Sequence, residues 1–198
     1  MPADNHRLFF ALKPIPQVAE RIARAAESAL TLHQARVRWT ASAKYHLTLH
    51  FLGNHAGAPH PVIDCAKVAA QSLVANAFGL TLDRIECFPG RRQVPFIVRC
   101  SRESESPLFA LRLMLGESLA AAGLAGLLED RFTPHVTIGY GPAADAMPVA
   151  IAPVTWPVTD FVLMQSRAGQ AEYDTLGRWP LRTLSVRAGG SAPDNGRA

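Results

Sequence analysis

Apolar residues recur along the first part of the chain at two periods, that of a strand and that of a helix. The unbroken run LFFAL at residues 8–12 predicts a buried strand, and a shorter strand is expected at 37–40. The alternating segment HLTLHFLG at 46–53 ends at a Gly-Asn turn and predicts another strand. Between the first two strands a helix is predicted, because apolar residues follow at spacings of three and four: Ile15, Val18, Ile22, Ala25 and Ala29.

A second helix is predicted at 59–75, with an apolar stripe of Val62, Ala66, Ala69 and Leu73. Strands at 80–87 and 95–100 follow it. The clearest helical signal comes next, with Ser106 as N-cap, Pro107 at the first helical position and Gly123 near the end. Its apolar stripe consists of leucines: Leu108, Leu111, Leu115 and Leu119.

The last third of the chain begins with PHVTIGY at 134–140, which predicts a strand. The proline-rich segment 141–157 is expected to be a loop, 158–165 a strand, and 173–184 a final hairpin arm around Gly177. The tail at 188–198 lacks the apolar groups to pack and is expected to be disordered.

Strand, helix and a strand that contains histidine occur in this order twice, which indicates an internal duplication. We therefore predict an α+β fold: one domain, residues 1–187, with two lobes related by a pseudo-two-fold axis. Each lobe would be a small, mainly antiparallel sheet with helices on the outside, and a cleft would separate the lobes.

Composition supports a packed protein, because 48% of the 198 residues are apolar and only 18% are charged. These values exclude an intrinsically disordered chain, and the 29 Gly and Pro residues (14 + 15) without a period exclude a collagen-like one. The net charge is +4, and 17 of the 20 basic residues are arginine, which permits a phosphorylated ligand without identifying one.

Targeting and redox signals favour the cytoplasm. The apolar run at 8–12 is too short for a signal peptide, and no stretch approaches the 18 apolar residues of a membrane span. Cys65, Cys87 and Cys100 have no metal-site spacing, so we interpret them as reduced and mostly buried. We expect a monomer without a membrane partner.

A doubled pattern carries the candidate chemistry. His46-Leu-Thr48-Leu and His135-Val-Thr137-Ile both read His, apolar, Thr, apolar. With 7 His and 10 Thr among the residues, shuffling gives about 0.35 occurrences of His-x-Thr, so two matched copies indicate a function. A single copy would more often be structural.

Strand geometry places each histidine and its threonine on the same face, while the apolar neighbours point to the other. If the two lobes face each other, the two pairs converge. Two imidazoles can then act as base and acid near neutral pH, and two hydroxyls can hold anionic oxygens between them. This arrangement suits in-line displacement at phosphorus, with catalytic residues His46, Thr48, His135 and Thr137.

Other chemistry is not indicated. Zinc binding by His46 and His50 fails because four residues of strand span about 13 Å. His50 shares the face of His46 and would line the cleft or touch solvent, and the remaining histidines, expected in termini, helix ends or loops, have no assigned role: His6, His33, His55 and His60. The sequence contains no nucleophile elbow, no phosphate-binding loop and no HExxH, so no metal and no cofactor is expected.

These residues resemble the 2H phosphoesterase superfamily, and within it the bacterial RNA 2′,3′-cyclic phosphodiesterases, also called 2′-5′ RNA ligases. The resemblance rests on both His-x-Thr motifs in their contexts, HLTLHFLG and FTPHVTI, and on RLFFA at 7–11. Ser166, Tyr173, Leu176 and the stretch WPL at 179–181 also resemble the ending of that group.

The resemblance implies hydrolysis of a terminal RNA 2′,3′-cyclic phosphate to a 2′-phosphomonoester, with reversible 2′-5′ joining as a side reaction. It implies His46 as proton donor to the leaving oxygen and His135 as the acceptor that activates water. Relatives often carry arginine where this chain has Tyr140, so that contact would come from Arg91, Arg92 or Arg131, or would be missing.

Three partners stay open at this point. The first is an RNA end or nucleotide with a 2′,3′-cyclic phosphate, which the resemblance favours. The second is a small cyclic phosphate such as ADP-ribose 1″,2″-cyclic phosphate. The third is RNA or a nucleotide bound without turnover, although binding alone would not need two titratable imidazoles.

Overall fold

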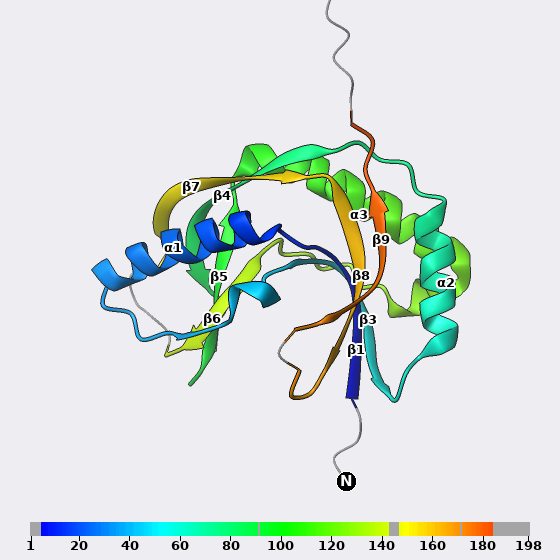
Figure 1. The fold of residues 1–198 in the computed structure, drawn as a ribbon, viewed down its shortest axis with the longest axis horizontal. Coiled ribbons are helices and arrows are strands. Elements are labelled where there is room, and N and C mark those ends of the chain that lie inside the picture. Colours follow the sequence, from blue (N-terminus) through cyan, green and yellow to red (C-terminus); the bar gives the residue numbers. More distant parts are fainter. Residues whose placement is uncertain (1–4, 91, 143–146, 171, 184–198) are drawn as a thin grey trace, which may run out of the picture.

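A computed structural model describes residues 5–90, 92–142, 147–170 and 172–183 (Figure 1). The helices are α1 (Pro16–Leu32), α2 (His60–Gln71) and α3 (Glu105–Leu119), and short 3-10 turns lie at Ser42–Lys44 and Arg102–Ser104. The strands are β1 (Asn5–Leu12), β2 (Arg38–Trp39), β3 (Leu47–Ala56), β4 (Phe78–Cys87), β5 (Val94–Cys100), β6 (Val136–Gly141), β7 (Val149–Val158), β8 (Asp160–Arg167) and β9 (Asp174–Pro180).

The strands form one antiparallel nine-stranded sheet. Eight of them follow the order β7-β4-β5-β6-β3-β1-β8-β9, and β2 pairs with β6 beside this path. With helices packed on the sheet, the protein has the expected α+β fold.

The sheet has two halves that meet at a single point. Four strands, β7-β4-β5-β6, form one half and β3-β1-β8-β9 the other, and the pairing of Leu47 with Val136 joins β3 to β6. Figure 1 shows the halves as the two limbs of an arch. The predicted two lobes are therefore halves of one continuous sheet.

These halves do not correspond to consecutive halves of the chain. β1 and β3 come from the first third of the chain and β8 and β9 from its last third, yet these four strands form one half, while the intervening strands β4 to β7 form the other. Helix α1 follows β1 but packs against β7 in the other half, while α2 packs against α3 and β9. Each half of the chain thus contributes to both lobes, which ties them together.

The predicted helices are present with some changes at their ends and faces. All four leucines of the α3 stripe are buried in the main core: Leu108, Leu111, Leu115 and Leu119. In α1, Val18, Ile22 and Ala29 are buried, whereas Ile15 is the exposed N-cap. In α2 the buried face is rotated and consists of Ile63, Ala66, Ala69 and Ala70.

Ser106 does not cap α3, contrary to the prediction. The chain already turns in a 3-10 helix at Arg102–Ser104, and α3 begins at Glu105 with Ser104 as its N-cap. Ser106 therefore lies inside the first helical turn. The hydroxyl of Ser104 instead accepts a hydrogen bond from the Thr81 amide at 2.9 Å, which fastens the start of α3 to β4.

The loop predicted at 141–157 is wrong for its second part, because residues 149–158 form the edge strand β7. The prolines of this segment concealed the alternating pattern of strand β7 in the sequence. An edge strand tolerates proline, and Pro153 falls in the register shift between Ala150 and Val154. The strand is held by alternating apolar side chains that enter the core: Val149, Ile151, Val154, Trp156 and Val158.

The cysteines and His6 differ from the sequence prediction. Cys100 is buried and Cys87 partly so, but Cys65 is exposed on α2, so the cysteines are less buried than predicted. His6, one of the histidines expected in termini, helix ends or loops, instead lies buried in β1. The tail at 188–198 and the domain end at 187 lie outside the described residues.

The helical run Arg102–Leu127, formed by α3 and its flanking turns, is long and apolar enough by length and composition to cross a membrane. The sequence prediction did not foresee this. Its leucine stripe nevertheless packs into the core beneath the sheet, and Gly123 interrupts the run with a positive φ of 86°. A helix that covers a sheet with such a face passes the same criterion.

Candidate active site

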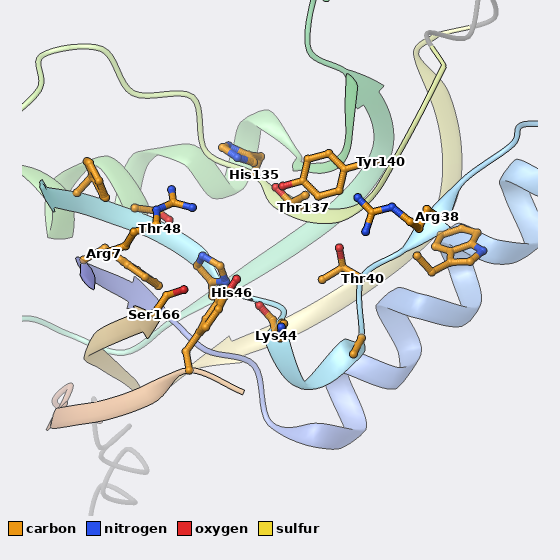
Figure 2. A pocket seen from close by; sticks show the side chains of 15 residues that line it. Arg7, Arg38, Thr40, Lys44, His46, Thr48, His135, Thr137, Tyr140 and Ser166 are labelled. Atoms are coloured by element: carbon orange, nitrogen blue, oxygen red, sulfur yellow. Dashed lines mark hydrogen bonds between the residues drawn. The ribbon is translucent and has the colours of Figure 1, made fainter. Parts of the chain in front are cut away.

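The four residues singled out from the sequence line one cleft of about 600 Å³ (Figure 2). His46 and Thr48 come from the start of β3, and His135 and Thr137 come from the start of β6. Each histidine immediately precedes the residue that joins the two halves of the sheet, Leu47 or Val136. The junction between the halves therefore holds the two imidazoles at the same cleft.

The two imidazoles are anchored in the same way. Nδ1 of His46 lies 2.7 Å from the carbonyl oxygen of Lys44, and Nδ1 of His135 lies 2.6 Å from that of Thr133. In both cases the partner is the residue two positions earlier. A carbonyl only accepts hydrogen bonds, so each Nδ1 carries the proton, and Nε2 is the nitrogen left for a ligand.

Aromatic rings fix the orientation of both imidazoles. The ring of His46 lies 4.9 Å from that of Phe9 and 5.5 Å from that of Tyr173. The edge of Phe88 contacts His135 with ring centres 4.8 Å apart. Such packing leaves each imidazole one orientation and removes it partly from water.

This burial disfavours the charged form of both imidazoles. Desolvation lowers the pKa of His46 to about 4, opposed by its hydrogen bond to the Lys44 carbonyl and assisted by the positive charges of His135, Arg7 and Lys13. Burial likewise lowers the pKa of His135, again against the effect of its backbone hydrogen bond. Without a ligand, both imidazoles are therefore neutral at pH 7.

A bulge follows each threonine at the same position of the doubled motif. In β3 the pairing with β1 skips Leu49, and in β6 the pairing with β5 skips Ile138. Each bulge shifts the alternation of side chains by one residue. As a result Phe51 and Tyr140, three residues after the threonines, line the cleft.

His50 does not line this cleft, contrary to the face assigned from strict alternation. The bulge at Leu49 turns it to the opposite side, where it is buried and its Nε2 lies 2.8 Å from the carbonyl oxygen of Arg112 on α3. Desolvation lowers its pKa. It belongs to the packing between β3 and α3, and to the wall of a smaller adjoining cavity.

Positive charge surrounds the cleft, and none of the described residues that line it is acidic. The guanidinium of Arg7 lies 5.5 Å from the ring centre of Phe51, and that of Arg38 lies 5.5 Å from the ring centre of Tyr140. Lys44 donates a hydrogen bond to the Gln170 carbonyl at 2.6 Å. The arrangement suits an anionic ligand.

The two sides of the cleft therefore resemble each other in more than the His-x-Thr motif. Each side contributes an imidazole, a hydroxyl, an aromatic ring three residues later and an arginine from the neighbouring strand beside that ring. Figure 2 shows Arg38 beside Tyr140, across the cleft from Arg7 and Thr48. The longer repeat, His-x-Thr-x-x-aromatic, was present in the sequence and was not recognised there.

Arg38 lies beside Tyr140, the position on β6 where relatives often carry arginine. Of the substitutes considered, Arg92 is exposed and does not line the cleft, Arg131 lines only the smaller adjoining cavity, and Arg91 is outside the described residues. Ser166 and Tyr173, noted for their resemblance, do line the cleft. Among the described residues, no three His, Cys, Asp or Glu side chains gather as a metal site would require.

Comparison with known proteins agrees with this geometry. A sequence model of the 2′-5′ RNA ligase superfamily matches residues 9–170. The solved structure of Escherichia coli LigT is similar at 26% identity and a TM-score of 0.68, covering 90% of this chain and 98% of LigT. LigT complexed with 3′-AMP matches at 27% identity and a TM-score of 0.67, covering 90% and 98%.

A protein from Thermus thermophilus has the same fold, with a TM-score of 0.69 at 19% identity over 90% of this chain and 99% of that one. No curated protein shows a significant match. The cleft brings together the two His-x-Thr motifs by which the sequence resembles the 2H phosphoesterases. The chain belongs to the 2′-5′ RNA ligase superfamily.

Proposed function

We propose that the protein hydrolyses the terminal 2′,3′-cyclic phosphate of RNA to a 2′-phosphomonoester. The observation that carries this proposal is the matched pair of imidazoles, each anchored through Nδ1 so that Nε2 faces a cationic cleft beside a threonine hydroxyl. A base and an acid on opposite sides of one phosphate are what in-line displacement needs.

In the proposed reaction, Nε2 of His135 takes a proton from water as the water oxygen attacks phosphorus. The bond from phosphorus to O3′ breaks, and protonated His46 gives its proton to the departing O3′. The products are the 2′-phosphomonoester and a free 3′-hydroxyl. The roles of the two histidines follow the resemblance to the family, because the doubled geometry is equivalent from either side.

Binding of the substrate would supply the charged imidazole that the resting site disfavours. A phosphate anion between two imidazoles favours protonation of one of them. Thr48 and Thr137 would donate hydrogen bonds to the non-bridging oxygens, and Arg7 and Arg38 would offset the charge that develops there. The complexes of LigT with 3′-AMP and with phosphate support a nucleotide phosphate as the ligand of this cleft.

The direct test is incubation with a 2′,3′-cyclic mononucleotide in EDTA, followed by product analysis. We expect the 2′-phosphate from the wild type, a loss of about 10²- to 10⁴-fold in kcat/KM for His46→Ala and for His135→Ala, and roughly 10²-fold for Thr48→Val or Thr137→Val. His60→Ala, on the exposed first residue of α2, is the matched control. Full activity of both cleft-histidine variants would sink the proposal.

A substrate with sulfur in place of the bridging O3′ assigns the two roles. A thiolate leaves without a proton, so the variant that lacks the general acid should recover with it. We expect recovery for His46→Ala and none for His135→Ala. The opposite pattern would exchange the assignments.

The same assay separates the other candidates. Higher kcat/KM on ADP-ribose 1″,2″-cyclic phosphate than on any RNA end would indicate a small-molecule phosphodiesterase. Tight, salt-sensitive RNA binding without any product would indicate a binding module.

A further inference from the structure

An open groove of about 660 Å³ continues from the cleft along β2 and β6. Arg38 and Tyr140 line both cavities, so the groove leads directly out of the proposed catalytic site. Beyond them it is lined by Arg36, Val37, Gln93, Gly141 and Pro142. None of these described residues is acidic.

The groove exists because β2 lies unusually close to β6. Glycines flank Tyr140 on both sides, and a Cβ on Gly139 would lie 2.8 Å from the carbonyl oxygen of Arg38. The backbone of Arg36 packs in the same way against Gly141. This close approach holds Arg36 and Arg38, two residues apart, on the rim beside the ring of Tyr140.

The rim has the two groups that single-stranded nucleic acids use. Tyr140 in the groove, and Trp39 in the adjoining cleft, are exposed aromatic rings, each 38% accessible, on which bases can stack. Arg36 and Arg38 form no ion pair among the described residues. Four other arginines, by contrast, are paired with carboxylates: Arg84, Arg99, Arg167 and Arg178.

The smaller cavity on the other side of the site, about 230 Å³, is less suited to a second phosphate. Its Arg112 donates hydrogen bonds to the carbonyl oxygens of Leu49 and Glu129. Glu129 also lines that cavity, beside Arg131, and offsets part of its positive charge. The groove along β2 therefore has the more available positive charge.

We propose that this groove binds the nucleotides on the 5′ side of the terminal phosphate. Arg36 would contact the next phosphate, Tyr140 would stack a base in the groove, and Trp39 would stack a base in the adjoining cleft. The substrate class would then be an oligonucleotide end rather than a mononucleotide. This inference rests on the proposed function for its orientation. If the inference is correct, the affinity of the protein for a ligand rises with the number of nucleotides in that ligand.

The test compares the dissociation constant of a trinucleotide ending in a 3′-phosphate with that of the corresponding 3′-mononucleotide. We expect the trinucleotide to bind at least ten-fold more tightly. Arg36→Gln should lower that ratio about five- to ten-fold and reduce the slope of log Kd against log salt by about 0.7, the value for one phosphate contact on a single strand. Arg24→Gln, an exposed arginine on α1 away from both cavities, makes the same charge change as a control and should keep the ratio.

Two results would overturn the inference. The first is that the wild type binds the trinucleotide and the mononucleotide about equally. The second is that Arg36→Gln keeps as strong a preference for the trinucleotide as Arg24→Gln does. Turnover of the 2′,3′-cyclic mononucleotide is measured in parallel. If that turnover is absent while the length-dependent affinity and its loss in Arg36→Gln persist, the proposed hydrolysis fails and the oligonucleotide groove stands.

Discussion

The two cleft histidines owe their equivalence to one backbone contact each. The carbonyl two residues earlier fixes the tautomer of His46 and of His135, and an aromatic contact fixes the ring. Both Nε2 atoms therefore enter the cleft unprotonated when the site is empty of ligand. Such a site starts with two bases and gains its acid only by taking up a proton.

That property predicts an acidic pH optimum. One imidazole must be charged and the other neutral, and both pKa values lie below the usual 6.5, that of His46 at about 4. At neutral pH the doubly neutral form predominates, so kcat/KM should rise as pH falls, reach its maximum below about 6.5 and decline again toward about pH 4, where both are charged.

A pH-rate profile with a 2′,3′-cyclic mononucleotide checks this, and its two limbs describe the pair rather than either residue. A flat profile between about pH 6 and 8 would contradict the burial argument. The exposed His60→Ala variant should reproduce the wild-type profile.

At the scale of elements, irregularities rather than regular strands shape the site. The bulges at Leu49 and Ile138 turn Phe51 and Tyr140 into the cleft. The glycines on either side of Tyr140 admit β2, which carries Arg38 and Trp39 to the rim. Each irregularity adds a ligand-facing group that a regular strand would point elsewhere.

Gly139→Ala should therefore damage both the sheet and the cleft. Its Cβ would lie 2.8 Å from the Arg38 carbonyl, and backbone cannot move away as a flexible side chain can. We expect a loss of about 1–3 kcal/mol in the free energy of unfolding by urea, and a larger effect on KM than on kcat because Arg38 is displaced.

Gly79→Ala is the matched control, since Gly79 lies in strand β4 and a Cβ there meets nothing within 4 Å. It should be neutral or slightly stabilising. Equal costs for the two substitutions would mean that close packing of β2 on β6 is not the cause.

Sequence patterns predicted elements well where one periodic face is buried. The leucine stripe of α3 corresponds to core residues, and the unbroken apolar run in β1 corresponds to a strand buried on both faces. The pattern failed at β7, where Pro153 and Pro157 obscured an alternation that an edge strand accommodates. It also failed at His50, because strict alternation cannot anticipate a bulge.

For the site, the doubled motif was enough to bring His46, Thr48, His135 and Thr137 to one cleft. Arg38 could not be found in this way, because it lies 102 residues (140 − 38) before its neighbour Tyr140 and on a two-residue strand. Its position depends on register between distant segments. The repeated aromatic residue three positions after each threonine was the one unused local signal.

At the scale of the whole molecule, two halves of a sheet meet at Leu47 and Val136, and the cleft lies at that junction. Each lobe takes strands from both halves of the chain, and helix α1, which follows β1, packs on β7 of the other lobe, so neither lobe can form from one half of the chain alone. The imidazoles of the cleft are buried in the folded protein and not in the unfolded chain, which links stability to their protonation.

That link predicts loss of stability in acid. The pKa values of His46, His50 and His135 are all lowered by burial in the folded state. Between about pH 6.5 and 4 the unfolded chain binds more protons than the folded protein, so stability is complete above about pH 6.5 and falls as pH falls. Each imidazole contributes at most about 1.4 kcal/mol per pH unit, and less where water reaches the ring.

Urea unfolding at several pH values measures the effect. Carboxylates titrate in the same range, so the quantity to compare is the difference between the wild type and His46→Gln. The variant should lose less stability on acidification, because it has no imidazole whose charging the fold opposes at that position. His33→Gln, at the exposed C-cap of α1, should keep the wild-type slope. If His46→Gln keeps it too, burial of the cleft imidazole is not coupled to folding.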